Sequence, residues 1–197
     1  MTYEIFTALA AFAFVTSITP GPNNLMLMTS GANFGFRRTI PHMLGVGLGF
    51  VFMVVLVGIG LFKIFEMYPV SSLILKVVSV LYMLYLAWKI ARSAPPKNAE
   101  AIGTPITFIQ AALFQWVNPK AWAMALTAIS VYAPSQDILN ILFVAVVFGA
   151  INLPSVGSWT VLGQQMRRIL DRPSRLRIFN VTMAILLVAS LYPVLQT

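Results

Sequence analysis

The sequence predicts an all-α integral membrane protein, a six-helix bundle made of two inverted three-helix repeats in which helices 1 and 4 are discontinuous. The first observation is composition: 59% of the 197 residues are hydrophobic, 9% are charged, and the mean hydropathy is +0.86. A water-soluble domain of this length could not cover its surface with so few polar groups. The other two observations are six long apolar windows and a pair of matching interruptions within them.

The six apolar windows set the number of predicted spans. A hydrocarbon core of about 30 Å needs about 20 apolar residues in a helix. Windows of this kind occupy residues 4–28, 42–63, 70–90, 106–132, 138–162 and 178–195. The first carries Glu4 and no preceding lysine or arginine, which favours a retained span over a secretory signal. The windows leave no room for a soluble domain, so residues 1–197 form a single transmembrane domain.

The basic residues predict how the chain is oriented. Ten of the 13 lysines and arginines lie in the connectors between spans 1 and 2, 3 and 4, and 5 and 6. They are Arg37, Arg38, Lys89, Arg92, Lys97, Arg167, Arg168, Arg172, Arg175 and Arg177. The positive-inside rule places these loops in the cytoplasm and both termini outside. The cluster at 167–177 also offers a site for anionic headgroups.

The polar linker 92–104 divides the chain into halves of about 1–91 and 105–197. Each half has an odd number of spans, so the second half crosses the membrane in the opposite sense, as an inverted repeat requires. The first helix of each half is interrupted by proline and asparagine. The interruptions are TPGPNN at 19–24 and QWVNPKAW at 115–122.

These interruptions predict a binding site near the membrane midplane. Proline in a helix removes a hydrogen bond and costs about 3 kcal/mol, and an opened helix survives in hydrocarbon only when buried in protein or lining a wet cavity. Freed carbonyls suit an ammonium group, and the N–H groups of a restarting helix suit a carboxylate. Secondary transporters build midplane sites in this way. The candidate residues are Pro20, Gly21, Pro22, Asn23, Asn24, Gln115, Asn118, Pro119, Lys120 and Asn152.

Lys120 is the most informative of these residues because it lies in the middle of an apolar window. A lysine at that depth costs about 2.5–3.5 kcal/mol on insertion scales, and no carboxylate lies at an obviously comparable depth. An anion from outside the protein would compensate the charge. The alternative is structural: the ammonium snorkels or binds a carbonyl freed near Asn118 and Pro119.

Three further features carry structural expectations. Gly45 and Gly49 form a small-xxx-small face that predicts close helix packing. NLPSVGSW at 152–159 predicts a third break, where Asn152 and Ser155 either face a cavity or repair freed carbonyls. His42 is expected to be an interfacial polar residue, with a proton shuttle as the minor alternative.

The composition argues against several functional classes. One histidine and no cysteine exclude the common metal-ligand clusters, so neither a metal nor a cofactor is expected. Five acidic residues, none paired in an apolar window, leave little for acid–base catalysis, and no catalytic residue is assigned. The net charge of +8 is explained by orientation, so no nucleic-acid partner is expected.

Four stretches carry a family resemblance: TPGPN at 19–23, GFRRTIPHMLGVGLG at 35–49, YLAWKIARS at 85–93 and FQWVNPKAW at 114–122. With them the chain resembles the LysE/RhtB family of bacterial amino-acid exporters. The resemblance covers most of the chain. It implies a bacterial inner-membrane protein that exports amino acids or close derivatives, driven by the proton motive force. It also implies a role in the substrate path for residues 20–24 and 118–120. No buried carboxylate stands out as a proton carrier, so coupling would involve His42, the substrate itself, or Asp137 and Glu4.

The sequence leaves other functions open. A passive channel or pore for small polar solutes would use the same polar breaks. A membrane scaffold with kinked packing helices is the third possibility. For the exporter, the expected partners are a small-molecule substrate, the proton and the lipid bilayer. A homo-oligomer is possible through the small-residue face of the second span.

Overall fold

The computed structural model confirms the all-helical membrane fold. It describes residues 2–61, 67–93, 104–133, 135 and 137–192, so most of the predicted linker 92–104 lies outside the described residues. The described part of the chain contains eight helices. They are α1 (Tyr3–Ile18), α2 (Pro22–Phe34), α3 (Phe36–Gly58), α5 (Pro69–Ala91), α6 (Phe108–Val117), α7 (Pro119–Tyr132), α8 (Ile138–Met166) and α9 (Pro173–Ala189).

Three described helices are long and apolar enough to cross a membrane alone: α3, α5 over Leu73–Ala91, and α8. The pair α1 and α2 forms a fourth candidate, bent by 56° at its break. The predicted windows 106–132 and 178–195 correspond to the shorter helices α6, α7 and α9, which do not reach this length singly. The six-span count and the inverted repeat therefore stay predictions.

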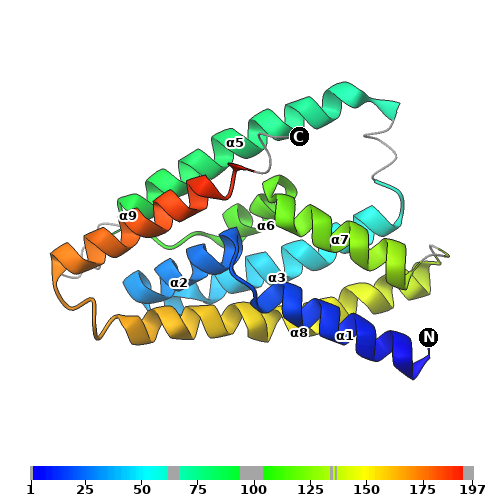
Figure 1. Cartoon of the computed structure of the whole chain (residues 1–197), viewed down its shortest axis with the longest axis horizontal. Helices are drawn as coiled ribbons and strands as arrows, with labels where there is room; N and C mark the ends of the chain where they lie inside the picture. Colours follow the sequence, from blue (N-terminus) through cyan, green and yellow to red (C-terminus); the bar gives the residue numbers. More distant parts are fainter. Residues whose placement is uncertain (1, 62–66, 94–103, 134, 136, 193–197) are drawn as a thin grey trace.

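The broken helices meet near the middle of the bundle's long axis (Figure 1). Buried apolar side chains form two clusters, one on each side of this level. The first joins α2, α5 and α9 and includes Met26, Leu86 and Phe179. The second joins α1, α3, α7 and α8 and includes Leu9 and Phe148. The polar breaks thus lie between two apolar cores.

Glycines allow α2 and α8 to pack with their backbones in contact. A Cβ on Gly31 would overlap the carbonyl of Thr160, and a Cβ on Gly163 would overlap the carbonyl of Met28. The contact is reciprocal, because each helix supplies one glycine and one carbonyl. Small residues permit such approach between membrane helices, where packing replaces the hydrophobic effect as the force of association.

The predicted packing role of Gly45 and Gly49 is confirmed. A Cβ on Gly45 would overlap the carbonyl of Phe108, and one on Gly49 would lie 2.7 Å from Cα of Ala112. Both glycines therefore let α3 lie directly against α6.

Two local predictions are wrong. The expected break at 152–159 is absent, because α8 runs without interruption through Pro154. Ser155 Oγ donates to Ile151 O at 2.8 Å, within the same turn. His42 is not interfacial: α3 begins six residues before the predicted window, and His42 is fully buried, with neither ring nitrogen hydrogen-bonded among the described residues.

The described basic connectors gather at one end of the bundle. The α2–α3 turn, the end of α5 and the α8–α9 turn all lie at the left in Figure 1. The turn between α8 and α9 also contains an ion pair, Arg175 Nη1 with Asp171 Oδ1 at 3.5 Å. Nine of the ten predicted loop cations lie at this end, and Lys97 is outside the described residues.

We expect Gly163→Ala to destabilise the protein although alanine is the better helix former. The added methyl group would press on the Met28 carbonyl, and overpacking of this kind costs about 1–3 kcal/mol. Gly157→Ala in the same helix is the matched control, because its Cβ would meet only the flexible end of Met43 at 3.1 Å. Thermal unfolding in detergent measures the difference, and equal melting temperatures would contradict the α2–α8 contact.

Candidate functional site

The first break follows from the backbone preferences of two prolines. Thr19 precedes Pro20 and is extended, with φ −64° and ψ 145°, because a residue before proline avoids the helical region. α1 therefore ends at Ile18. Pro22 then occupies the first turn of α2, where its missing N–H is not needed.

The second break has the same local design. Asn118 is extended, with ψ 109°, and precedes Pro119 at the start of α7. Its side-chain oxygen accepts from the backbone N–H of Lys120 at 3.2 Å and so caps the new helix. Both interruptions therefore restart a helix at a proline, and both predicted discontinuities are confirmed.

Every backbone carbonyl from Val15 to Gly21 has a hydrogen-bond donor, at distances of 2.8–3.3 Å. This matters because an unpaired carbonyl in hydrocarbon costs several kcal/mol. The donors are Thr19 N for Val15, Thr19 Oγ1 for Thr16, Asn24 Nδ2 for Ser17, Trp159 Nε1 for Ile18, Lys120 Nζ for Thr19 and Pro20, and Leu25 N for Gly21.

Lys120 joins the two breaks. Its Nζ donates to Thr19 O at 2.8 Å, Thr19 Oγ1 at 2.9 Å and Pro20 O at 3.3 Å. The ammonium thus lies at the carbonyl end of α1, where the helix dipole favours a cation. Gly21 makes room for it, because a Cβ there would lie 2.9 Å from Lys120 Cδ. The acceptors belong to the first break, and not to Asn118 and Pro119 as the structural alternative supposed.

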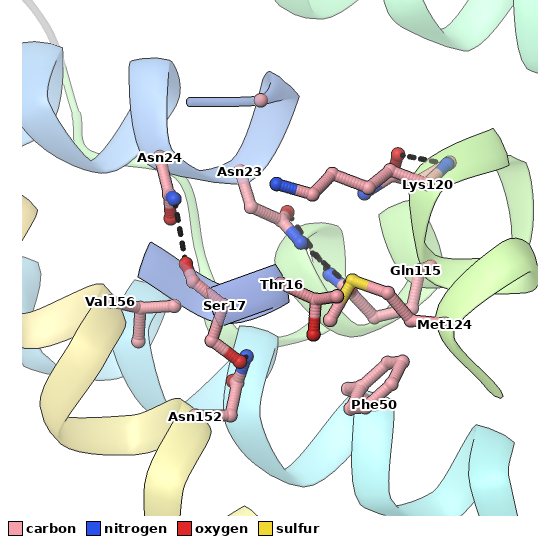
Figure 2. A pocket seen from close by; sticks show the side chains of 13 residues that line it. Thr16, Ser17, Asn23, Asn24, Phe50, Gln115, Lys120, Met124, Asn152 and Val156 are labelled. Carbon is pink, nitrogen blue, oxygen red and sulfur yellow. Dashed lines mark hydrogen bonds between the residues drawn. The ribbon is translucent and has the colours of Figure 1, made fainter. Parts of the chain in front are cut away.

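Amide side chains make the remaining contacts between the helices. Asn23 Nδ2 donates to Gln115 Oε1 at 2.8 Å, and Gln115 Nε2 donates back to Asn23 Oδ1 at 3.2 Å. Asn152 reaches the site from α8 and donates through Nδ2 to Ser17 Oγ at 3.0 Å. Figure 2 shows the side chains of Asn23, Lys120 and Gln115 directed toward one another from the two broken helices.

These residues enclose one small cavity. Among the ten predicted site residues, the cavity is lined by Gly21, Asn23, Asn24, Gln115, Asn118, Lys120 and Asn152. The prolines Pro20, Pro22 and Pro119 do not line it, and their role is to set the breaks. The cavity measures about 20 Å³, enough for a water molecule and too small for an amino acid.

The cavity offers groups of both electrostatic kinds. Among the described residues, Lys120 is held by neutral oxygens alone. α2 begins without a side-chain cap, so the positive end of this helix also faces the site. Asn152 Oδ1 is buried and has no hydrogen-bond partner among the described residues. Asn152 thus brings an acceptor without a described partner to a residue position that lines the cavity. Among described residues no carboxylate lines the cavity.

Sequence reasoning missed several residues of the site. Ser17 and Trp159 hold its polar framework, and Thr16, Phe50 and Met124 line its wall. Trp159 lies in the predicted third break, yet nothing local shows that its Nε1 reaches Ile18 O at 3.0 Å. Asp137 is the N-cap residue of α8, Glu4 lies in the first turn of α1, and neither lines the cavity.

We expect Asn24→Leu to destabilise the protein by about 1–3 kcal/mol, the usual cost of a buried polar group left unpaired. Asn24 is 3% exposed, and its Nδ2 serves both Ser17 O and Thr19 O at 2.8 Å. Asn140→Leu, at the start of α8, makes the same chemical change outside the site. Thermal unfolding of the purified variants measures the effect, and equal loss in both would argue against a special role of Asn24.

Comparisons with known proteins identify the family of the chain. The model of the LysE type translocator family matches residues 14–190. A cysteine/O-acetylserine efflux protein of Escherichia coli (strain K12) is 30% identical over 190 residues, covering 95% of this chain and 96% of the relative. The protein of that name from Shigella sonnei (strain Ss046) gives the same values, and that of Escherichia coli O139:H28 is 29% identical.

No solved structure matches the chain significantly. The family model and these relatives extend over almost the whole sequence, and they include both interrupted helices. The chain therefore belongs to the LysE type translocator family and is a multi-pass membrane transporter, not an enzyme.

Proposed function

We propose that this protein exports small amino-acid derivatives of the cysteine or O-acetylserine type. The names of its relatives support this substrate class, and one observation on the chain itself carries the proposal. Lys120 and Asn152 line the same cavity, and the Oδ1 of Asn152 has no partner among the described residues. An ammonium donor and an amide acceptor at one site suit the carboxylate and the ammonium group of an amino acid.

In the bound state, the substrate carboxylate takes Lys120 Nζ from the carbonyls of Thr19 and Pro20. The start of α2 adds a second positive end for the same group. The substrate ammonium then binds Asn152 Oδ1 and the released carbonyls. This exchange replaces neutral acceptors of Lys120 with a charged one, which adds the direct attraction between an ammonium and a carboxylate.

The size of the cavity implies movement during transport. A site of about 20 Å³ admits an amino-acid derivative only after the two breaks separate. The hydrogen bonds of Lys120 and the Asn23–Gln115 pair hold the two breaks together. Both are side-chain contacts, which can break and re-form with other partners. We therefore place the alternating-access movement between α1–α2 and α6–α7, with the six spans of the sequence prediction as two inverted halves.

The basic end of the bundle faces the cytoplasm in this proposal, and both termini lie outside. The membrane is the bacterial inner membrane, as the family resemblance implies. Export then carries the substrate from the end of the bundle that bears the arginine-rich turns to the end that bears Glu4 and Asp137.

We further propose that His42 couples export to the proton gradient. The sequence named His42, Asp137 and Glu4 as possible coupling groups. His42 is fully buried, whereas Asp137 caps α8 by accepting a 3.4 Å hydrogen bond from Asn140 N. Both ring nitrogens of His42 lack partners among the described residues, so either nitrogen has room to exchange a proton. A buried polar group left unpaired in this way calls for a functional explanation.

The first test is efflux from cells preloaded with labelled cysteine and O-acetylserine. We expect Lys120→Met to reduce the rate at least about tenfold, because losing a charge-assisted contact costs about 1.5–3 kcal/mol. Lys76→Met on α5 removes the same charge away from the cavity and should leave the rate unchanged. Membrane abundance of each variant is measured in parallel.

Full activity of Lys120→Met at normal abundance would make the lysine a structural brace and overturn the site. Flux that rises linearly with concentration and ignores substrate identity would support the channel instead. Efflux that does not exceed the empty-vector rate, combined with altered stability of the variants, would support the scaffold.

The second test concerns coupling. Wild-type efflux should accelerate when the external medium is acidified, because proton entry then drives export. His42→Gln should lose this dependence while keeping exchange of labelled for unlabelled substrate. Glu4→Gln and Asp137→Asn are the matched controls and should keep the pH dependence. Unchanged pH dependence in His42→Gln would exclude the histidine as the coupling group.

A further inference from the structure

A second, larger depression lies at the basic end of the bundle, away from the transport cavity. This open groove measures about 610 Å³ and lies between the α2–α3 turn and the end of α8. We call it the arginine groove. Its lining includes Gly35, Arg37, Arg38, Val161, Gln164 and Arg167.

The groove is built by contacts between the turn and α8. Gly35 has φ +78°, which favours glycine, and so turns the chain sharply between α2 and α3. Gln164 Oε1 accepts from the Phe36 N–H at 2.6 Å and fixes this turn against α8. Arg37 and Arg38 are thereby held on the same groove as Arg167, which lies about 130 residues later in the chain.

The three arginines have no acidic partner among the described residues. The ion pair found in the described part of the chain joins Arg175 to Asp171, outside the groove. Arg38 lies 5.6 Å above the ring of Phe34, which positions its guanidinium on the groove wall. The start of α3 adds the positive end of a 23-residue helix. The groove therefore presents an uncompensated positive charge.

The depth of the groove indicates which anion it meets. α3 starts and α8 ends here, and both helices are membrane-span candidates, so the groove lies at headgroup level. Directly along α3, Ile40, Leu44 and Leu48 form an exposed stripe at four-residue spacing. On α8, Val161 is 41% exposed and lines the groove itself. The charged lining of the groove thus continues into an apolar surface along α3 and α8.

We propose that the arginine groove binds an anionic phospholipid. Its phosphate contacts Arg37, Arg38 and Arg167, because the guanidinium group of arginine can donate two hydrogen bonds to one phosphate. Its acyl chains lie along the Ile40–Leu48 stripe. The proposal is independent of the transported substrate, and it gives these three arginines a specific ligand beyond their contribution to orientation.

The test is native mass spectrometry of the purified protein with phosphatidylglycerol or phosphatidylcholine of identical acyl chains. Wild type should retain phosphatidylglycerol in clear preference. Each arginine near a membrane surface contributes a factor of about five in affinity, so Arg37→Gln/Arg38→Gln/Arg167→Gln should weaken retention at least about tenfold. Arg168→Gln/Arg172→Gln/Arg177→Gln removes the same charge at the same end and should retain the lipid.

Because loss of three loop arginines can disturb orientation or folding, Arg167→Gln alone is also compared with Arg168→Gln. Only Arg167→Gln should lower retention, by about fivefold. Equal loss of lipid retention in the two matched sets would show that net charge alone accounts for the effect, and it would overturn the proposed site. Equal retention of the two lipids by wild type would do the same. Binding of glycerophosphoglycerol, the headgroup without acyl chains, at equal strength would replace the lipid with a soluble phosphate and also overturn the proposal.

Discussion

The need to pair every backbone carbonyl in an apolar environment governs this structure. A helix that stops at Ile18 inside the bundle exposes the carbonyls of its last turn. Water does not satisfy them in hydrocarbon, so side chains from distant helices do. Asn24 comes from the following helix, Lys120 from α7 and Trp159 from α8. The break can exist only because these three helices surround it, and the packing of the bundle follows from that requirement.

The same constraint connects stability with transport. Lys120 has two roles that alternate: it pairs carbonyls when the site is empty, and in the proposed mechanism it pairs the substrate carboxylate when the site is occupied. A permanent carboxylate partner would hold the ammonium too firmly to exchange. Neutral oxygens at 2.8–3.3 Å satisfy the charge and still yield to a stronger acceptor. This explains why a costly lysine is found here without an acidic neighbour among the described residues.

Sequence reasoning located both interruptions because proline acts on its own backbone and on the residue before it. It also identified the amides and the lysine, since polar groups are rare in apolar windows. It failed where the answer depends on other helices. His42 is buried because α3 continues past Pro41, and Pro154 is tolerated inside α8. The hydrogen-bond partners of Ser17 Oγ and Trp159 Nε1 lie more than 100 residues away, and no local pattern encodes such pairs.

The reciprocal glycine contact between α2 and α8 gives the molecule a mechanical asymmetry. The backbones of α2 and α8 touch at Gly31 and Gly163, so no side chain lies between them there. A change of rotamer therefore cannot loosen this contact. On the other side of the site, α7 is tethered to the first break through one long, flexible lysine chain. We therefore expect the bundle to deform more easily between α7 and the first break than between α2 and α8. In the proposed mechanism, α2 and α8 stay together while α7 moves.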